Sequence, residues 1–171
     1  MRFQIDPAFQ NNELNIINSI ESQLVNDSRV SSNSYLSTLV VSVEPYEDDK
    51  VSKGRTHPNP AKGKDGIVSI NTASNFFNMA INDQIGIFIH EIGHIYYATL
   101  SRTDKLITSY GIPLNADMNI DCIACDWGFL KELYNTRVNS HNVIYADTLK
   151  RYSTGEQVVD ELDRIHNLML I

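Results

Sequence analysis

The residues best suited to chemistry are those of the run His90-Glu91-Ile92-Gly93-His94. On a helix, two histidines four residues apart project from the same face, so their ring nitrogens can bind one metal ion. Glu91 lies about 100° further round such a helix. There its carboxylate can take a proton from a metal-bound water and later give it to a leaving amine. The run therefore predicts a hydrolytic metal centre with His90 and His94 as ligands and Glu91 as general base.

The residues around this motif are mostly apolar, which predicts a buried helix that begins near Asp83 and continues through Tyr96. Buried polar groups that lack partners cost on the order of 1 to 3 kcal/mol each. A bound metal therefore explains the motif better than chance does. Gly93 has no side chain, which leaves room for another helix to approach between the two histidines.

A catalytic zinc usually keeps three protein ligands and one open position, so a further ligand is expected. The helix predicted over Ala116–Tyr134 offers Asp117, Asp121 and Asp126. Small residues share the helix face of Asp121, which would let that helix press close to the metal. We therefore expect Asp121 to be the third ligand. Asp117 is the alternative ligand, or a partner that orients a ligand histidine, and Asp126 is expected on the surface.

The two cysteines allow a different metal site. Cys122 and Cys125 could join His90 and His94 in a closed structural zinc site, since all four are good zinc ligands. That arrangement would leave Glu91 without a role, so the catalytic interpretation is preferred. Cys125 is retained as an alternative ligand or as a residue that orients one.

From Ile67 to Leu133 the chain resembles the minimal zincin core of the ImmA/IrrE family of phage and bacterial zinc peptidases. The resemblance comprises a strand, a helix with the His-Glu-x-x-His motif and a second helix that supplies an acidic ligand. Segment 121–128 aligns with the family pattern Glu-x-x-Ala-Asn-x-Phe-Ala, with Asp in place of the ligand Glu. The resemblance implies zinc-dependent hydrolysis of a peptide bond. It also implies that a strand binds the extended substrate as an added strand, here Ile67, Val68, Ser69, Ile70 and Asn71.

Composition limits the other classes of function. A chain of 171 residues with 42% hydrophobic residues can form one compact core, so a single domain over 1–171 is expected. A net charge of −7 argues against nucleic acid as a partner. No stretch approaches the roughly 20 apolar residues of a membrane span, and two closely spaced cysteines do not form a secreted disulfide framework. A cytoplasmic protein is expected.

Hydrophobic patterns predict an α+β fold, mostly helical, with a small antiparallel or mixed sheet packed on the motif helix. A first amphipathic helix should end near Asn26, and strands are expected over Tyr35–Val43 and Ile67–Asn71. The polar segment 47–66 is expected to be a mobile loop. A terminal amphipathic helix is expected over Thr154–Leu170.

The sequence thus favours a metallopeptidase with one zinc ion per chain and a protein or peptide substrate. The alternative is a catalytically silent zincin-like module that binds or regulates a partner. Tyr96, Tyr97, Tyr110 and His141 could each donate a hydrogen bond to an oxyanion, although packing or exposure is the default for each. The pattern does not indicate the substrate or the oligomeric state.

Overall fold

Four strands form one mixed sheet in the computed structural model, which describes residues 1–47, 60–101, 104, 117–139 and 143–155. Their order is β1-β2-β4-β3. Strands β1, β2 and β4 run parallel, and β3 pairs antiparallel with β4. The strands are β1 (Arg2–Ile5), β2 (Val40–Tyr46), β3 (Ala61–Lys64) and β4 (Ile67–Asn71).

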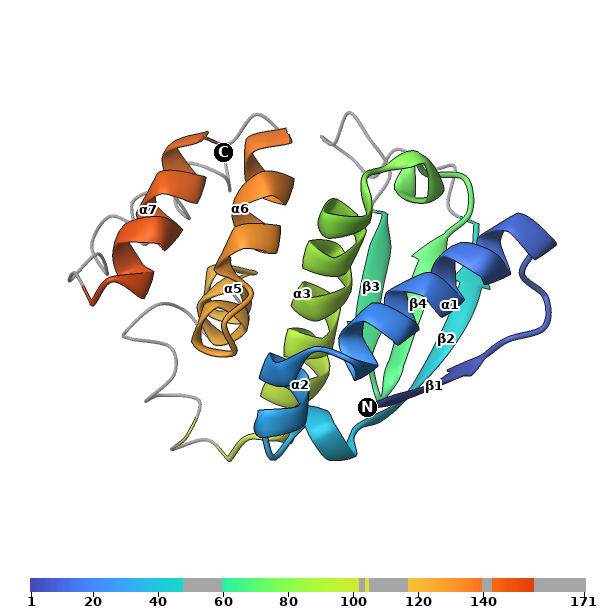
Figure 1. Cartoon of the computed structure of the whole chain (residues 1–171), viewed down its shortest axis with the longest axis horizontal. Coiled ribbons are helices and arrows are strands. Elements are labelled where there is room, and N and C mark those ends of the chain that lie inside the picture. Colours follow the sequence, from blue (N-terminus) through green and yellow to red (C-terminus); the bar gives the residue numbers. More distant parts are fainter. Residues whose placement is uncertain (48–59, 102–103, 105–116, 140–142, 156–171) are drawn as a thin grey trace.

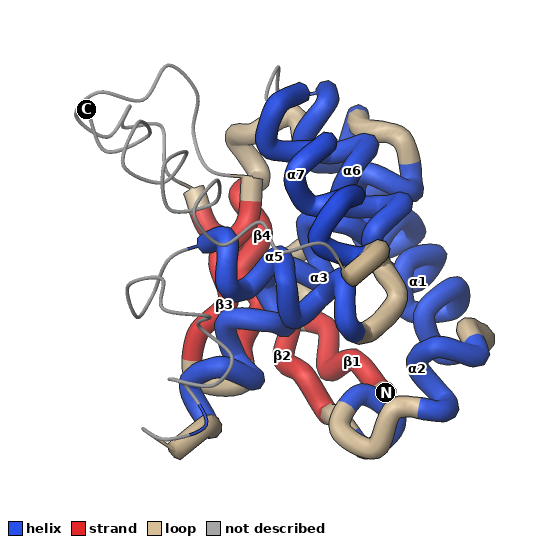
Figure 2. The backbone as a smooth tube through the Cα atoms, turned by 90° about the vertical axis from the view of Figure 1, so that its left-hand side faces the viewer, coloured by secondary structure: helices blue, strands red, loops and turns tan. Residues whose placement is uncertain are grey.

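The helices lie on one side of this sheet. Figure 1 shows α3 between the sheet and the pair α5 and α6, with α7 further out. Figure 2 looks from the side of α7 and shows helices in front of the strands. The α-helices are α1 (Asn11–Val25), α2 (Ser28–Ser32), α3 (Ile81–Thr99), α5 (Asp117–Asp126), α6 (Leu130–Asn139) and α7 (Val143–Ser153). Two 3-10 turns cover Leu36–Thr38 and Phe76–Asn78.

Alternation along the strands explains why α3 packs on this face. Val41, Val43, Val68 and Ile70 are fully buried, whereas the residues between them are half-buried or exposed. Such a period of two places the apolar side chains on one face of the sheet. Phe88 of α3 stacks there on Phe3 of β1, with ring centroids 4.7 Å apart. The helix that carries the motif is thereby held between the sheet and the later helices.

The predicted α+β class is confirmed, and the sheet is mixed. The first helix is also confirmed, but the strand expected over Tyr35–Val43 is shifted toward the C-terminus. Residues Leu36–Thr38 form a 3-10 turn, and β2 continues through Pro45. Val43 pairs toward β1 and Ser42 toward β4, so alternation directs the Pro45 nitrogen toward the side of β1. Proline is tolerated there because β1 ends at Ile5, opposite Val43, and an N–H at this position is not needed.

The expectation of a loop over 47–66 is wrong in its last part. Residues 61–64 form β3, which is joined to β4 by Asp65 and Gly66, both with positive φ. Two such residues are the signature of a tight hairpin turn. The apolar content of β3 is too low to reveal a strand, and residues 48–59 lie outside the described part of the chain.

The expected helix over Ala116–Tyr134 is two helices. Gly128 has φ +90°, a left-handed conformation that ends α5 and lets the chain turn into α6. Most of the helix expected over Thr154–Leu170 lies outside the described residues, whereas α7 and β1 were not predicted. Among the described residues, no helix combines the length and apolar composition needed to cross a membrane.

Candidate metal centre

The two motif histidines face one another on α3, as their spacing predicts. Their Nε2 atoms lie 3.2 Å apart, and the ring planes meet at 82°. His90 is buried, and His94 is partly exposed toward a cavity. A pair of imidazole nitrogens directed at one point is the geometry in which both can bind the same metal ion.

Asp117, at the start of α5, completes a group of three. Its Oδ1 lies 3.5 Å from His94 Nε2. One ligand atom from each of His90, His94 and Asp117 falls within 4.8 Å of the other two, and the described residues hold no other such group. Two imidazoles and one carboxylate match the donor set of a catalytic zinc that keeps one position open.

Asp121 does not join this group, contrary to the expectation that it is the third ligand. Its Oδ1 lies 2.6 Å from His90 Nδ1, the ring nitrogen on the opposite side of the imidazole from Nε2. A carboxylate there orients the ring and holds the proton on Nδ1, which leaves the Nε2 lone pair available. Asp117 therefore lies with the metal-facing histidine nitrogens, and Asp121 lies behind His90. This is the reverse of the preferred arrangement expected from the sequence.

Three further donors surround the buried Asp121 carboxylate. Oδ2 accepts hydrogen bonds from Arg137 Nε at 2.8 Å and from the Tyr145 hydroxyl at 2.7 Å, and Arg137 Nη2 lies 2.7 Å from it. Burial alone would raise the pKa of this carboxyl, but Arg137 and His90 hold it well below its usual value. Asp121 thus links α3, α5, α6 and α7 through its contacts with His90, Arg137 and Tyr145.

This network also sets the protonation of the two histidines. Burial lowers the pKa of His90, but the Asp121 carboxylate outweighs that effect, so the net pKa is raised. Burial and the neighbouring His90 lower the pKa of His94 to about 4. His94 is therefore neutral near pH 7, which is the form that binds metal.

Glu91 points from α3 toward β3. Its Oε2 accepts a hydrogen bond from the Gly63 backbone N–H at 2.5 Å. A side chain at position 63 could not fit, because a Cβ atom there would lie 2.0 Å from the Glu91 carbonyl oxygen. Burial raises the pKa of the Glu91 carboxyl, and His90 and the Gly63 N–H partly oppose that rise.

A cavity of about 310 Å³ joins these groups. Its walls come from β3, α3, α6 and the start of α5. They include the three-residue group, Glu91 and the cationic side chain of Arg137. The arrangement brings two imidazoles, two carboxylates and a guanidinium to one partly open space.

Close packing of α5 on α3 occurs at the glycine of the motif. A Cβ atom at Gly93 would lie 2.5 Å from Ile120 Cγ2. Gly93 therefore provides the approach expected from the sequence, although Ile120 rather than a small residue fills the space.

The structural-zinc interpretation does not fit the described residues. Cys122 and Cys125 are buried free thiols, and neither belongs to the group of metal-ligating atoms around the histidines. Burial raises the pKa of both thiols well above the usual value. Cys125 is likewise not placed as an alternative ligand.

The suggested substrate strand must also be corrected. Strand β4, residues Ile67, Val68, Ser69, Ile70 and Asn71, is paired with β2 on one side and β3 on the other. An added strand cannot reach its backbone groups. The strand at the edge of the sheet, beside the cavity, is β3.

The tyrosines suggested as oxyanion donors lie elsewhere. Tyr96 packs against Tyr35 and Trp127, and Tyr97 packs with Ile120 and Ile123. Neither lines the cavity. Tyr110 and His141 lie outside the described residues.

Three residues of the site escaped the sequence analysis. Gly63 lies in a strand too polar to be recognised, and Tyr145 lies in a helix that was not predicted. Arg137 follows a helix that was expected to end at Tyr134. A cation would have been a reasonable partner to seek for a buried aspartate, but its position depends on the turn at Gly128.

Comparisons with protein-family models, with curated proteins and with solved structures found no match for this chain.

Proposed function

We propose that this chain is a zinc-dependent metallopeptidase. The observation that carries the proposal is the group formed by His90, His94 and Asp117, with Glu91 in the same cavity. Nitrogen and carboxylate donors in this number suit zinc. A metal bound there would polarise a substrate carbonyl and make water nucleophilic near neutral pH.

The protein's own contribution to hydrolysis centres on Glu91. Its carboxylate accepts the proton of the attacking water and returns it to the nitrogen of the leaving amine. Burial suits this task, because a raised pKa brings the carboxyl closer to the pH at which protons must move both ways. The Gly63 N–H fixes the carboxylate toward the cavity.

A peptide is the substrate class that the surroundings favour. Strand β3 is an edge strand that contributes Ala61, Lys62 and Gly63 to the cavity wall. An extended peptide can align with such an edge through backbone hydrogen bonds. Arg137 adds a cation to the opposite wall, where it can face a carbonyl oxygen that gains negative charge during the reaction.

The test is to measure bound zinc, and cleavage of a proteome-derived peptide library, in matched variants. Glu91→Gln should keep zinc and lose at least about 100-fold in cleavage, the lower end of the usual contribution of a general base. Asp117→Ala should lose zinc affinity. Asp126→Ala, on the exposed side of the same helix, should behave like wild type.

Other outcomes would point to other functions. A Glu91→Gln variant that cleaves as fast as wild type would overturn the proposal. Full zinc binding without cleavage by the wild type would favour a silent zincin-like module. Zinc loss and unfolding in Cys122→Ser/Cys125→Ser would instead support the structural-zinc interpretation.

A further inference from the structure

A buried side chain of helix α7 takes part in the hydrogen-bond network behind His90. Tyr145 is 2% exposed, and its hydroxyl donates a hydrogen bond of 2.7 Å to Asp121 Oδ2. Helix α7 packs on α5 and α6, the helices that carry Asp121 and Arg137. Tyr145 therefore connects α7 with the network around His90.

The hydrogen bond from Tyr145 to Asp121 Oδ2 matters because the other carboxylate oxygen, Oδ1, contacts His90. Asp121 Oδ1 meets His90 Nδ1, and Oδ2 is shared by Arg137 and Tyr145. Two donors from two helices fix the rotation of the carboxylate about its own axis. That rotation sets the position of Oδ1, which in turn sets the direction of the His90 ring and of its Nε2 atom.

Arg137 alone would hold the carboxylate less firmly. Its Nη2 also lies 3.3 Å from His90 Nδ1, so the guanidinium and the imidazole crowd the same carboxylate. The Tyr145 hydroxyl approaches from α7, a different element. Its loss would let the carboxylate turn toward Arg137 and away from His90.

We propose that Tyr145 is a positioning residue for metal binding: through Asp121 it holds the His90 imidazole so that Nε2 points at the site shared with His94 and Asp117. This inference rests on the proposed zinc centre and adds that the packing of α7 affects the affinity for metal. By thermodynamic linkage the effect is reciprocal: whatever displaces α7 weakens metal binding, and bound metal stabilises the docked α7.

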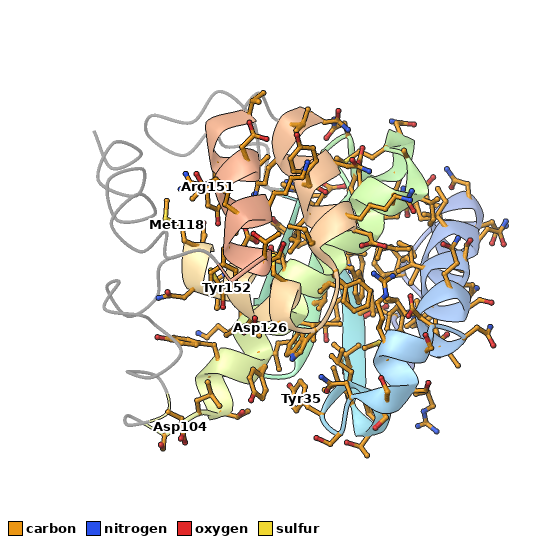
Figure 3. All side chains as sticks on the ribbon, turned by 60° about the vertical axis from the view of Figure 1, so that its left-hand side comes forward. Tyr35, Asp104, Met118, Asp126, Arg151 and Tyr152 are labelled. Atoms are coloured by element: carbon orange, nitrogen blue, oxygen red, sulfur yellow. The ribbon has the colours of Figure 1, made fainter. Side chains whose placement is uncertain are left out.

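The experiment uses Tyr145→Phe in the full chain, with zinc affinity measured by competition with a chelator at a temperature where the variant is folded. Zinc should bind about tenfold more weakly than to wild type, within the 10- to 100-fold range usual for groups that orient a metal ligand. Tyr152→Phe is the matched control. Tyr152 lies on the same helix, is partly exposed, and its hydroxyl donates a hydrogen bond to Asp126 of α5; both residues are labelled in Figure 3.

A further variant and a spectroscopic measurement distinguish a positioning role of Tyr145 from a purely structural one. Ile17→Val removes a methylene from the buried core in α1, away from the network, and should leave zinc affinity unchanged. Cobalt(II) in place of zinc gives a visible spectrum that reports ligand geometry. Its bands should shift in Tyr145→Phe and stay unchanged in Ile17→Val and Tyr152→Phe.

Failure of this inference can be distinguished from failure of the proposed function. If wild type binds zinc and Tyr145→Phe binds it equally well with the same cobalt spectrum, this inference is overturned and the proposed function stands. The same holds if Ile17→Val loses as much affinity as Tyr145→Phe. A wild type that binds neither metal overturns the zinc centre, and this inference with it.

Discussion

Removing the Asp121 side chain should destabilise the protein even when no metal is present. The carboxylate is fully buried, and its loss would leave the Arg137 guanidinium, whose side chain is 24% exposed, without its anionic partner. Breaking a buried pair from one side typically costs about 3 to 5 kcal/mol. That is a large part of the roughly 5 to 15 kcal/mol by which domains are stable.

The expected change in thermal unfolding follows from chain length. For proteins of about 150 to 250 residues, each kcal/mol shifts the midpoint by roughly 2 to 4 °C. Asp121→Ala should therefore lower the Tm by about 6 to 20 °C in the presence of a chelator. Asp126→Ala should change it by less than about 2 °C, because Asp126 is exposed on the same helix.

A double variant makes the reasoning stricter. The double variant removes the guanidinium that Asp121→Ala alone would leave without this carboxylate, so Asp121→Ala/Arg137→Met should unfold at a higher temperature than Asp121→Ala alone. The assay is calorimetry or circular dichroism on metal-free protein. If the two substitutions lower the Tm additively, the pair is not coupled and the reasoning fails. If Asp121→Ala leaves the Tm unchanged or raises it, the Asp121 charge does not hold these helices together.

Two further predictions concern other parts of the structure. Gly63→Ala forces β3 away from the Glu91 carbonyl, and overpacking of this kind costs about 1 to 3 kcal/mol. The Tm should fall by about 2 to 12 °C and cleavage should weaken, whereas Lys64→Ala on the same strand is the exposed control. An unchanged rate in a stably folded Gly63→Ala protein would contradict a role for the Gly63 N–H. The hydrogen bond from the Arg29 side chain lowers the pKa of Asp27, so its charge stabilises the fold above pH about 4, and this contribution is lost as the pH falls further. Urea unfolding from pH 3 to 7 should show wild type more stable than Asp27→Asn near neutrality, with the gap closing in acid; a gap independent of pH would speak against this.

The sequence predicted the parts of the site that depend on spacing along one helix. His90, Glu91 and His94 lie within two turns of α3, so helical geometry alone relates them. Asp117 and Asp121 share one helix face for the same reason, and the sequence singled out both as candidates. One aspartate lies near His94 Nε2 and the other contacts His90 Nδ1, and which is which depends on the position of α5 along the axis of α3. A periodic pattern in the sequence does not specify that position.

The missed features depend on contacts between distant segments. Strand β3 is stabilised by pairing with β4 and packing on α3, not by the preferences of Ala61–Lys64. Gly128 ends α5 because the chain turns there to place α6 against α3, whereas a glycine within a helical pattern is equally compatible with a continuous helix. Tyr145 enters the site only through the docking of α7.

The buried thiols of Cys122 and Cys125 can be used to measure local unfolding around α5. Both thiols lie on α5 between the aspartates of the site and the turn at Gly128, and both are shielded and protonated in the folded chain. A thiol reagent reaches a buried thiol when the structure around it opens, so the labelling rate measures the free energy of that local opening. Because α5 also carries Asp117, a metal ion bound at the proposed centre would hold α5 against α3 and slow the labelling. The labelling rate would then report the occupancy of the centre without any substrate.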